Sequence, residues 1–432
     1  MTDCLPPAPW TKRPDLARLV GALGAGNARY VGGAVRDTLL GIEVKDIDLA
    51  TPLIPEDVMA RLDAAKIGHV PTGIAHGTIT AILKGGPVEI TTLRHDVSTD
   101  GRRATVAFAS DWQDDAARRD FTINALYADP ASGEISDFFG GLDDLKARRV
   151  RFIGDARERI REDHLRILRY FRFQARFGSE PADAESEAAC ADLAATLKGL
   201  SRERIGMEML NLLALPNPAP TAARMAEMGV LAQVLPEANV GALAALVAEE
   251  MRQEITPDAL RRLASLLPAD ADVAVKVAAQ FRLSGAQKKR LVSAADRNPP
   301  GHGEGDHPKG GGGAHAQTPP DESPPPADSA PPTASLVLLP QGGGSQAPRA
   351  LAYRLGMDKA LDHLLLTGGD TAPLKGWTIP TFPLKGGEIV ARGIKAGPEV
   401  ARILRAVEDR WVAEGFPDKA RVERLLEAEL KQ

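Results

Sequence analysis

The sequence predicts an N-terminal α/β part built on a small mixed sheet, followed by a chain that is helical almost throughout. β-Branched residues alternate with others at 77–83 and 88–93, which is typical of two adjacent antiparallel strands. The apolar segment 28–31 runs into two glycines and then into a helical pattern, as in a strand–turn–helix unit. Residues 180–296 are rich in Ala and Leu with breaks mostly at prolines, which indicates a helical region.

Local periodicity predicts the other elements of the N-terminal part. They are helices at 16–23, 34–40 and 55–66 and strands at 28–31, 46–51 and 134–138. Residues 94–107 are polar and are expected to form a mobile loop, whereas 111–127 has a helical pattern. The pair Gly140-Gly141 then marks a hinge before a basic stretch.

Length and composition exclude several classes of protein. A chain of 432 residues is too long for one ordinary core, and 44% hydrophobic with 26% charged residues is typical of globular domains. No run of 18 apolar residues predicts a membrane span, and no apolar stretch near the N-terminus predicts a signal peptide. Cys4 and Cys190 lie far apart, so neither a zinc site nor a disulfide framework is expected. We therefore expect a cytoplasmic protein with no membrane contact.

The charge of the chain is distributed unevenly. Its net charge is −5, but residues 146–176 contain 11 Lys or Arg against four acids, a local charge of +7. A basic segment inside an acidic protein is the pattern expected of a site for a polyanion such as RNA.

The C-terminal third changes composition twice. Residues 298–349 are rich in Pro and Gly with almost no aromatic residues, so we expect a disordered linker. Residues 350–432 return to a globular composition, with helices expected at 398–414 and 419–430.

The first chemical motif is Gly32-Gly33-x-x-Arg36-Asp37. Glycines let backbone N–H groups approach phosphate oxygens, and the start of a helix adds partial positive charge. Arg36, one turn into the helix, could bind phosphates as a fork. The same residues are also compatible with an ordinary strand–turn–helix corner.

The second motif is Asp46-Ile47-Asp48. Side chains at i and i+2 of a strand point to one face, so the two carboxylates could share two Mg²⁺ ions. Such ions would activate an attacking 3′-hydroxyl and stabilise a leaving pyrophosphate. Glu89 on a neighbouring strand is a possible third ligand. The alternative is a solvated edge strand.

Two further motifs concern the nucleotide. Arg119-Asp120 could hold a phosphate and a ribose hydroxyl, although a surface pair fits equally well. On one continuous helix, Glu162, Asp163, Arg166 and Arg169 would share a polar face. An Asp beside an Arg matches adenine and cytosine, which both present an amino donor beside a ring-nitrogen acceptor. A solvated, salt-bridged helix face remains the alternative.

These motifs together resemble the class II tRNA nucleotidyltransferase/poly(A) polymerase family. The resemblance rests on Tyr30 to Asp37, Asp46 to Thr51, Arg118 to Ala125, Asp137 to Leu145, Arg161 to Arg169 and Glu203 to Glu208. Phe382 to Leu384 and Gly397 to Val400 also resemble a tail segment of CCA-adding members.

The resemblance implies a nucleotidyltransferase-like head followed by an all-α neck, body and tail. We expect the head at 1–145, the neck at 146–200, the body at 201–297, the linker at 298–349 and the tail at 350–432, with body and tail binding RNA. It also implies that Gly33, Arg36, Arg119, Arg166 and Arg169 bind the incoming nucleotide and that Asp46 and Asp48 bind Mg²⁺.

The expected reaction is template-independent addition of C, C and A to the 3′ end of tRNA, from CTP and ATP with release of pyrophosphate. The nucleotide-binding set is Gly33, Arg36, Arg119, Asp120, Asp163, Arg166 and Arg169. The alternatives are a bacterial poly(A) polymerase, an enzyme restricted to CC or to A addition, and a catalytically silent RNA-binding protein. No protein partner is indicated.

Overall fold

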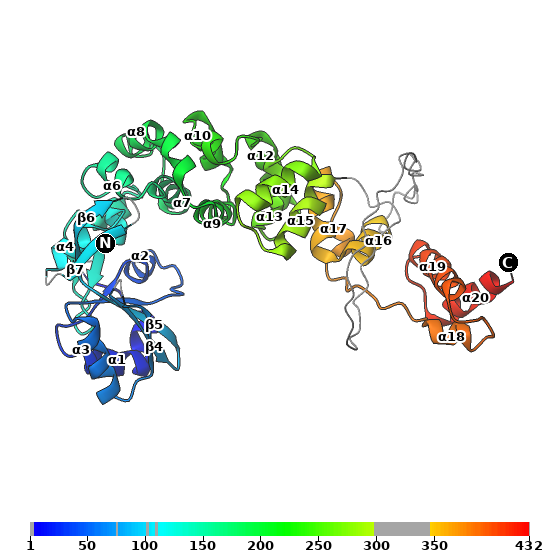
Figure 1. The fold of residues 1–432 in the computed structure, drawn as a ribbon, viewed down its shortest axis with the longest axis horizontal. Helices are drawn as coiled ribbons and strands as arrows, with labels where there is room; N and C mark the ends of the chain where they lie inside the picture. The colour runs from blue at the N-terminus through cyan, green and yellow to red at the C-terminus, as the bar shows by residue number, and fades with distance from the viewer. Residues whose placement is uncertain (1–3, 75–76, 101–102, 109–110, 298–345, 432) are drawn as a thin grey trace, which may run out of the picture. The chain divides into compact units, whose positions relative to one another are not determined.

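The computed structural model describes residues 4–74, 77–100, 103–108, 111–297 and 346–431, with backbone alone for 95–100 and 103–108 (Figure 1). The chain forms two compact units. Unit 1 comprises residues 1–248 and 255–291, and unit 2 comprises 249–254 and 292–432. Each unit is described by itself below.

Unit 1 begins with a seven-stranded mixed sheet in the order β3-β4-β5-β2-β1-β8-β9. The strands are β1 (Arg29–Val31), β2 (Asp48–Thr51), β3 (His69–Gly73), β4 (Thr78–Leu83), β5 (Gly86–Thr92), β8 (Leu126–Ala128) and β9 (Ile135–Asp137). Only β2 and β5 run parallel; the other neighbouring strands are antiparallel. The expected α/β head with a small mixed sheet is therefore confirmed.

Three helices pack on or beside this sheet. Helix α1 (Pro14–Leu23) packs against α3 (Pro55–Ala64), and both contact β4 (Figure 1). Leu16, Leu19 and Leu23 recur at helical spacing on α1 and are fully buried, which is why this short helix forms. Helix α2 (Gly33–Leu39) follows the glycine turn and contacts β1 and β8.

The sequence prediction was wrong for three segments of this region. Residues 94–107 do not form a loop but an antiparallel hairpin of β6 (Arg94–Asp100) and β7 (Arg103–Phe108), separate from the main sheet. The segment 111–127 is not one helix: α4 (Trp112–Ala117) ends before a 3₁₀ turn at Thr122–Asn124 and strand β8. Strand β3 was not expected. It lies at the edge of the sheet, where Pro71, which has no backbone N–H, is tolerated.

The rest of unit 1 is helical. Its helices are α5 (Gly141–Lys146), α6 (Ala156–Glu162), α7 (Arg166–Phe177), α8 (Ala184–Asp192), α9 (Arg202–Leu213), α10 (Ala219–Glu227), α11 (Leu231–Val234), α12 (Val240–Arg252), α13 (Ala259–Leu266), α14 (Ala271–Gln280) and α15 (Gly285–Asp296), the last residues of α12 and α15 belonging to unit 2. Helix α9 is the centre of this packing because it contacts α7, α13 and α14.

The predicted continuous helix through residues 162–169 is interrupted. Helix α6 ends at Glu162, Asp163 is extended with φ −150° and ψ 103°, and α7 begins at Arg166. The Asp163 carboxylate accepts from the backbone N–H of Leu165 at 3.1 Å, and its carbonyl accepts from the N–H of Arg166. Asp163 thus satisfies free donors at the start of the second helix, which is how a short acidic side chain competes with helix continuation.

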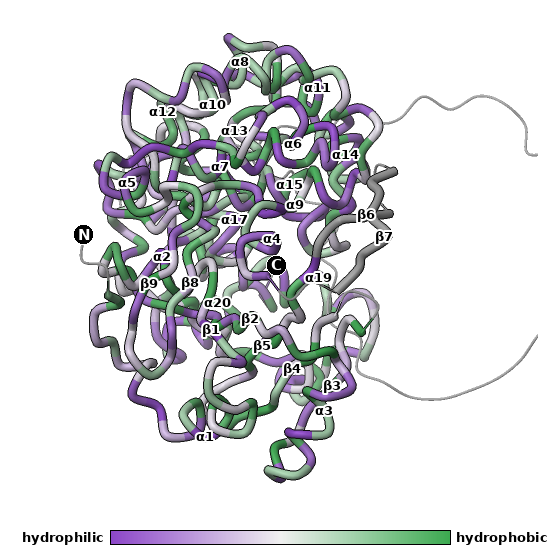
Figure 2. Tube along the Cα trace, turned by 90° about the vertical axis from the view of Figure 1, so that its left-hand side faces the viewer, coloured by the Kyte–Doolittle hydropathy of each residue, from purple (hydrophilic) through white to green (hydrophobic). Residues whose placement is uncertain are grey.

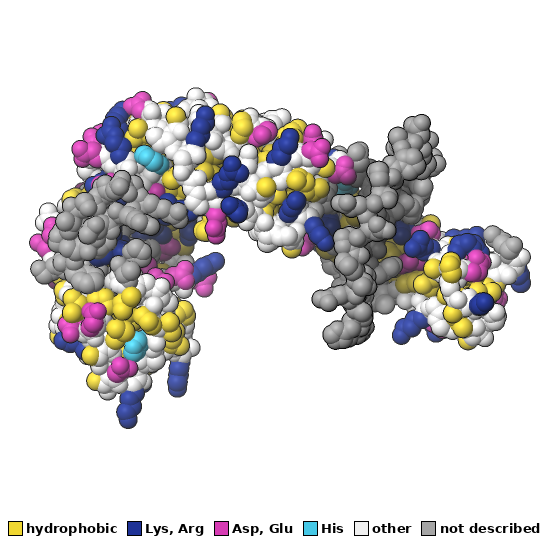
Figure 3. Space-filling view, in the orientation of Figure 1, with side chains coloured by type: hydrophobic (Ala, Val, Ile, Leu, Met, Phe, Trp, Pro, Cys, Tyr) yellow, Lys and Arg dark blue, Asp and Glu magenta, His cyan; other side chains and the backbone are white. Residues whose placement is uncertain are grey.

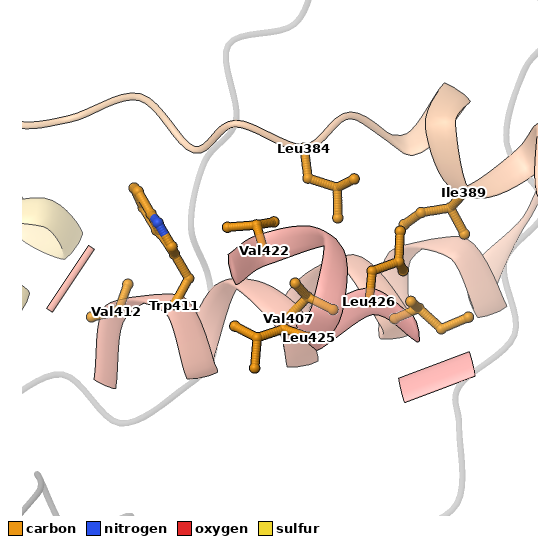
Figure 4. Packing of buried hydrophobic residues seen from close by; sticks show 9 residues of the cluster. Leu384, Ile389, Val407, Trp411, Val412, Val422, Leu425 and Leu426 are labelled. Carbon is orange, nitrogen blue, oxygen red and sulfur yellow. The ribbon is translucent and has the colours of Figure 1, made fainter. Parts of the chain in front are cut away.

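Unit 2 contains α16 (Gln346–Leu355), α17 (Met357–Thr367), α18 (Gly386–Val390), α19 (Pro398–Ala413) and α20 (Lys419–Leu430). Figure 4 shows the buried side chains that join α18, α19 and α20, with Trp411 of α19 and Leu426 of α20 among them. A second buried cluster joins α16 and α17 through Leu351 and Ala360. The helices expected at 398–414 and 419–430 are confirmed.

The expected linker lies mostly outside the described residues, which resume at Gln346. Residues 346–349 belong to α16, so the predicted C-terminal boundary of the linker was wrong by four residues. Figure 2 shows hydrophobic and hydrophilic residues interleaved along the described helices, and none of those helices is long and apolar enough to span a membrane.

Candidate active site

Three acidic residues, Asp46, Asp48 and Glu89, lie near the start of β2. Asp48 is the first residue of β2, is half-buried, and lies opposite Glu89 of β5 in the parallel pair. Asp46 lies two residues before the strand and is exposed, so the expectation of two acids within one strand was wrong. The backbone pairing nevertheless extends to Ile47, whose carbonyl accepts from the N–H of Glu89 at 3.3 Å.

The environment of Asp48 fits a divalent cation. Burial, and then the neighbouring charges of Glu89 and Asp46, raise the pKa of Asp48 to about 6, while Arg119 acts in the opposite direction. A Mg²⁺ ion would offset this repulsion, and it prefers carboxylate oxygens. Among the described residues, no three His, Cys, Asp or Glu side chains are already arranged as a metal site. Metal binding by Asp46 and Asp48, with or without Glu89, therefore stays a prediction.

The glycine turn brings the start of α2 close to Arg119. Gly32 has φ +67°, a conformation that residues with a Cβ adopt rarely, and a Cβ there would lie 3.4 Å from Nη1 of Arg119. Gly33 is the first residue of α2. The turn and Asp48 thus both lie near Arg119.

Arg36 does not have the free guanidinium that the sequence predicted. Its side chain is buried and donates through Nε to Asp37 at 2.7 Å and through Nη1 to Oδ1 of Asn124. The guanidinium also lies 4.1 Å from the ring centre of Phe177. These contacts use some of the five N–H donors of Arg36 and connect the turn to Asn124 and to Phe177 of α7, so nucleotide binding by Arg36 stays a prediction.

Five of the predicted nucleotide-binding residues line one pocket. The pocket has a volume of about 290 Å³, and its lining residues are Arg118, Arg119, Asp120, Asp163, Arg166 and Arg169. They come from the segment after α4, from the α6–α7 break and from the first turn of α7. Long-range folding therefore brings together two motifs that lie more than forty residues apart in the sequence. Gly33, Arg36, Asp46 and Asp48 are not among the lining residues.

Asp120 works mainly as an anchor. It is 8% exposed; its Oδ1 accepts from Asn124 Nδ2 at 2.9 Å, and its Oδ2 accepts from Arg169 Nε at 2.9 Å. Burial alone would raise the pKa of Asp120, but Arg169 and Asn124 hold it below its usual range. Asn124 thus links Arg36 to Asp120, which in turn orients Arg169 toward the pocket.

Asp163 and Arg166 each form an ion pair with another residue, Asp163 with Arg204 and Arg166 with Glu162. Asp163 Oδ2 accepts from Arg204 Nη2 at 2.7 Å, and Arg166 Nη1 donates to Glu162 Oε2 at 2.6 Å. Arg166 also donates to the backbone carbonyls of Arg159 and Arg118. Both side chains are therefore oriented before any ligand binds, which lowers the entropic cost of recognition.

The neck arginines are mostly paired within the protein, which corrects the interpretation of the +7 segment. Examples are Arg157 with Asp192, Arg159 and Arg166 with Glu162, and Arg172 with Glu208. The exposed basic residues of this segment include Lys146, Arg148 and Arg161. The positive charge therefore builds the pocket and its supports more than an open RNA-binding face.

Sequence reasoning missed two buried polar residues behind the pocket. Asp115 is 1% exposed and accepts from both Arg118 and Arg119, and Tyr127 donates to the same carboxylate. The spacing of Asp115, four residues before Arg119, is the helical i,i+4 spacing of an ion pair and could have indicated it.

The structure thus has a mixed-sheet head followed by helical segments, with a pocket lined by arginines and aspartates. Residues 28–151 match the family model of the poly A polymerase head domain, and residues 183–241 match the model described as the probable RNA and SrmB-binding site of polymerase A. Over these two segments the chain resembles the tRNA nucleotidyltransferase/poly(A) polymerase family.

Two similar proteins of known name are described as CCA-adding enzymes or CCA tRNA nucleotidyltransferases. Human mitochondrial CCA tRNA nucleotidyltransferase 1 is 48% identical over 188 residues, 43% of each chain. The CCA-adding enzyme of Geobacillus stearothermophilus is 39% identical over 206 residues, 47% of this chain and 50% of that protein. The matched segment thus spans half the length of these relatives or less.

A solved structure extends the likeness in fold. The CCA-adding enzyme of Bacillus stearothermophilus in complex with CTP matches with a TM-score of 0.65 over 97% of this chain and 98% of that one. Its sequence identity is 24%, so the likeness concerns the fold.

Proposed function

We propose that this protein adds C, C and A to the 3′ end of tRNA from CTP and ATP, with release of pyrophosphate. The observation that carries the proposal is the pocket in which Asp163 and Arg166 lie beside Arg118, Arg119 and Arg169. A site with one acceptor–donor pair and several arginines suits a nucleobase attached to a triphosphate. The names of the human and Geobacillus relatives support the same reaction.

Base selection follows from the groups that remain available on Asp163 and Arg166. A guanidinium has five N–H donors, and the bonds of Arg166 to Glu162 Oε2 and to the carbonyls of Arg159 and Arg118 use three, leaving Nε–H and one Nη2–H. The Asp163 carboxylate keeps acceptor capacity beyond its bonds to Leu165 and Arg204. Cytosine and adenine offer the complementary donor and acceptor, whereas guanine and uracil offer the reverse.

Asp46 and Asp48 would hold Mg²⁺ in this proposal. When bound, two Mg²⁺ supply Lewis-acid polarisation at the α-phosphate and neutralise charge on the leaving pyrophosphate. Arg119 lines the pocket, and its charge opposes the rise in the pKa of Asp48, so it would bind phosphate oxygens near the metal. Arg169, oriented by Asp120, would contact phosphate or ribose from the other side.

The helical segments are proposed to hold the tRNA. Figure 3 shows Lys and Arg side chains along the helices of unit 1, interspersed with acidic ones. Helices α14 and α15 and the turn between them carry four exposed basic residues, Lys276, Arg282, Lys288 and Lys289. Contacts of Lys and Arg with phosphates supply most of the affinity of such an interface. The tail in unit 2 is proposed to contribute as well.

A poly(A) polymerase is the second candidate, because both matching family models carry polymerase A in their descriptions. Restriction to CC or to A addition is compatible with the same pocket. A catalytically silent RNA-binding protein is less consistent with it, since an inactive head need not retain a carboxylate such as Asp48, whose pKa is raised by burial and by the charges of Glu89 and Asp46.

The deciding experiment supplies the purified full-length protein with tRNA that lacks its 3′ CCA. With CTP alone we expect two added residues, and with subsequent ATP one more followed by a stop. A ladder of A residues would establish the second candidate, and a stop after CC or addition of A alone would establish the restricted enzymes. Absence of product with every RNA acceptor would support the silent protein.

One variant and one comparison of nucleotides test the assigned roles. Asp48→Ala should abolish Mg²⁺-dependent transfer, and retained transfer would refute the metal assignment. Incorporation of GTP and UTP at the rate of CTP and ATP would refute base selection by Asp163 and Arg166.

A cytoplasmic location is part of the proposal, and cell fractionation tests it. The human relative is named as mitochondrial.

A further inference from the structure

Four hydrogen-bond donors converge on one buried carboxylate behind the pocket. Asp115 Oδ1 accepts from Arg118 Nε at 2.9 Å and from the backbone N–H of Arg94 at 3.3 Å. Its Oδ2 accepts from Arg119 Nη2 at 3.2 Å and from the Tyr127 hydroxyl at 2.6 Å. The carboxylate therefore connects α4, the two arginines after it, strand β8 and the first residue of the β6–β7 hairpin.

Tyr127 closes a small ring of hydrogen bonds with the same groups. Its hydroxyl accepts from Arg119 Nε at 3.1 Å and donates to Asp115 Oδ2. Arg119 is thus gripped through two of its nitrogens, one by the carboxylate and one by the phenol. A guanidinium held at two points cannot rotate freely, so its remaining donors keep a constant direction.

The two arginines held in this way both line the pocket. Arg118 also offers its backbone carbonyl to Arg166 Nη2 at 3.2 Å, so its position affects the proposed base-reading residue. Arg119 lies 3.4 Å from the point where a Cβ on Gly32 would be, and its charge acts on Asp48. Through Arg118 and Arg119, the Asp115 carboxylate therefore influences the glycine turn, Asp48 and Arg166.

We propose that Asp115 is the positioning residue of this site, which orients Arg118 and Arg119 for the triphosphate of the incoming nucleotide and fixes the base of the β6–β7 hairpin beside them. The inference rests on the proposed nucleotidyltransferase function. Asp115 itself would touch neither nucleotide nor RNA, because Arg118, Arg119 and Tyr127 surround it and it is 1% exposed. It would act on the nucleotide through the two arginines.

Asp144 provides a matched control. It is a buried aspartate of the same unit, 0% exposed, that accepts from Arg149 Nε, Arg151 Nε and the Thr122 hydroxyl. Neither of its arginines lines the pocket. Asp144→Asn removes the same charge from the same kind of cluster, so it reproduces the loss of stability without the proposed effect on nucleotide binding.

The test compares Asp115→Asn, Asp144→Asn and wild type for the KM of CTP, the KM of tRNA lacking CCA, and the melting temperature. We expect Asp115→Asn to raise the KM of CTP at least tenfold while the KM of tRNA stays within twofold of wild type. Asp144→Asn should lower the melting temperature comparably and change neither KM. Equal effects of the two variants on the KM of CTP would overturn the proposal.

Tyr127→Phe covers the case in which Asp115→Asn does not fold. It removes one donor to Asp115 and one acceptor from Arg119 but keeps the carboxylate and both arginines, so we expect a smaller rise, about threefold, in the KM of CTP. An unchanged KM of CTP in this variant would also overturn the proposal. Calorimetry of CTP binding without tRNA tests the role of Asp115 separately from the proposed function. If wild type binds CTP but transfers no nucleotide, the proposed function is refuted. The CTP dissociation constants of the variants still test Asp115 in that case.

Discussion

Asp48 and Glu89 lie opposite each other on β2 and β5, the one parallel pair among the described strands of the main sheet. Residues opposite each other on adjacent strands project on the same face, so the two carboxylates are neighbours by register alone. Their proximity contributes to the pKa of about 6 at Asp48. The sheet therefore holds two carboxylates close enough to repel each other, and a bound cation would reduce this repulsion. Glu89 is thus a candidate to support the metal.

Glu89→Gln tests that role. If Glu89 supports the metal, the Mg²⁺ concentration for half-maximal nucleotide transfer should rise about tenfold, the scale typical of losing a group that supports metal binding. The measurement is the initial rate of CTP incorporation across a Mg²⁺ titration. Glu56→Gln, an exposed substitution on α3, serves as the control. A half-maximal concentration that is the same in both variants would limit the metal site to Asp46 and Asp48.

Arg204→Gln tests whether Asp163 needs its ion pair to select the base. Without Arg204 the carboxylate loses its 2.7 Å partner and can rotate, so the acceptor for the base amino group is less well oriented. Loss of one charge-assisted hydrogen bond corresponds to about 1.5 kcal/mol, so discrimination of CTP over UTP should fall about tenfold. Competition assays with the two nucleotides measure this ratio.

The control for this variant is Arg224→Gln, which removes an arginine paired with Glu187 and Glu227 at an exposed position. Its discrimination ratio should equal that of wild type. If Arg204→Gln weakens CTP and UTP use by the same factor, Arg204 supports binding in general and selection depends on other groups.

Asp120→Asn tests the anchor between Asn124 and Arg169, and it has a defined pH dependence. The pKa of Asp120 lies below its usual range in the folded protein, with burial opposed by Arg169 and Asn124. Its charge therefore stabilises the fold fully above the unfolded pKa of about 4, and this stabilisation is lost as the pH falls through the folded pKa. Removing one partner of a buried pair should cost about 3 kcal/mol at pH 7.

Urea unfolding of wild type and Asp120→Asn at pH 7 and at pH 3.5 measures both effects. The difference in unfolding free energy between the two proteins should shrink at the lower pH. A difference that stays constant would mean that the variant acts through altered packing rather than through the lost charge.

The local patterns of the sequence were sufficient for the glycine turn, the sheet strands at 28–31, 77–83 and 88–93, and the two last helices. They failed where structure depends on backbone pairing alone. The hairpin of β6 and β7 is separate from the main sheet, so its polar first strand lacked the apolar alternation that burial imposes. The end of α6 was missed because Asp163 interrupts the helix with its side chain, without a Gly or Pro.

The site was predicted in its residue types more than in their roles. Asp163, Arg166, Arg119, Arg169 and Asp120 line one pocket, whereas Arg36 does not. The side chains of Arg36 and Asp120 are hydrogen-bonded to other protein residues. Counting charges along the sequence treats every arginine as available, whereas folding pairs several of those in the neck with acids from distant segments. Such pairing is invisible without long-range contacts.

Trp411→Ala concerns unit 2 and separates the tail from the catalytic head. Trp411 is 2% exposed, packs in the cluster of Figure 4 and donates from Nε1 to the carbonyl of Pro417 at 2.7 Å. Replacing a buried aromatic residue by Ala should cost about 3–5 kcal/mol, so hydrogen exchange in α19 and α20 should accelerate while exchange in the main sheet is unchanged. Trp10→Ala, which removes a buried tryptophan from unit 1, should accelerate exchange in the main sheet and leave exchange in α19 and α20 unchanged.

If the tail holds tRNA as proposed, Trp411→Ala should also raise the KM of tRNA and leave the KM of CTP unaltered, because the nucleotide pocket is built entirely from residues 118–169. A parallel rise in both constants would mean that the tail affects the head directly, and an unchanged KM of tRNA despite faster exchange would remove the tail from the tRNA-binding surface.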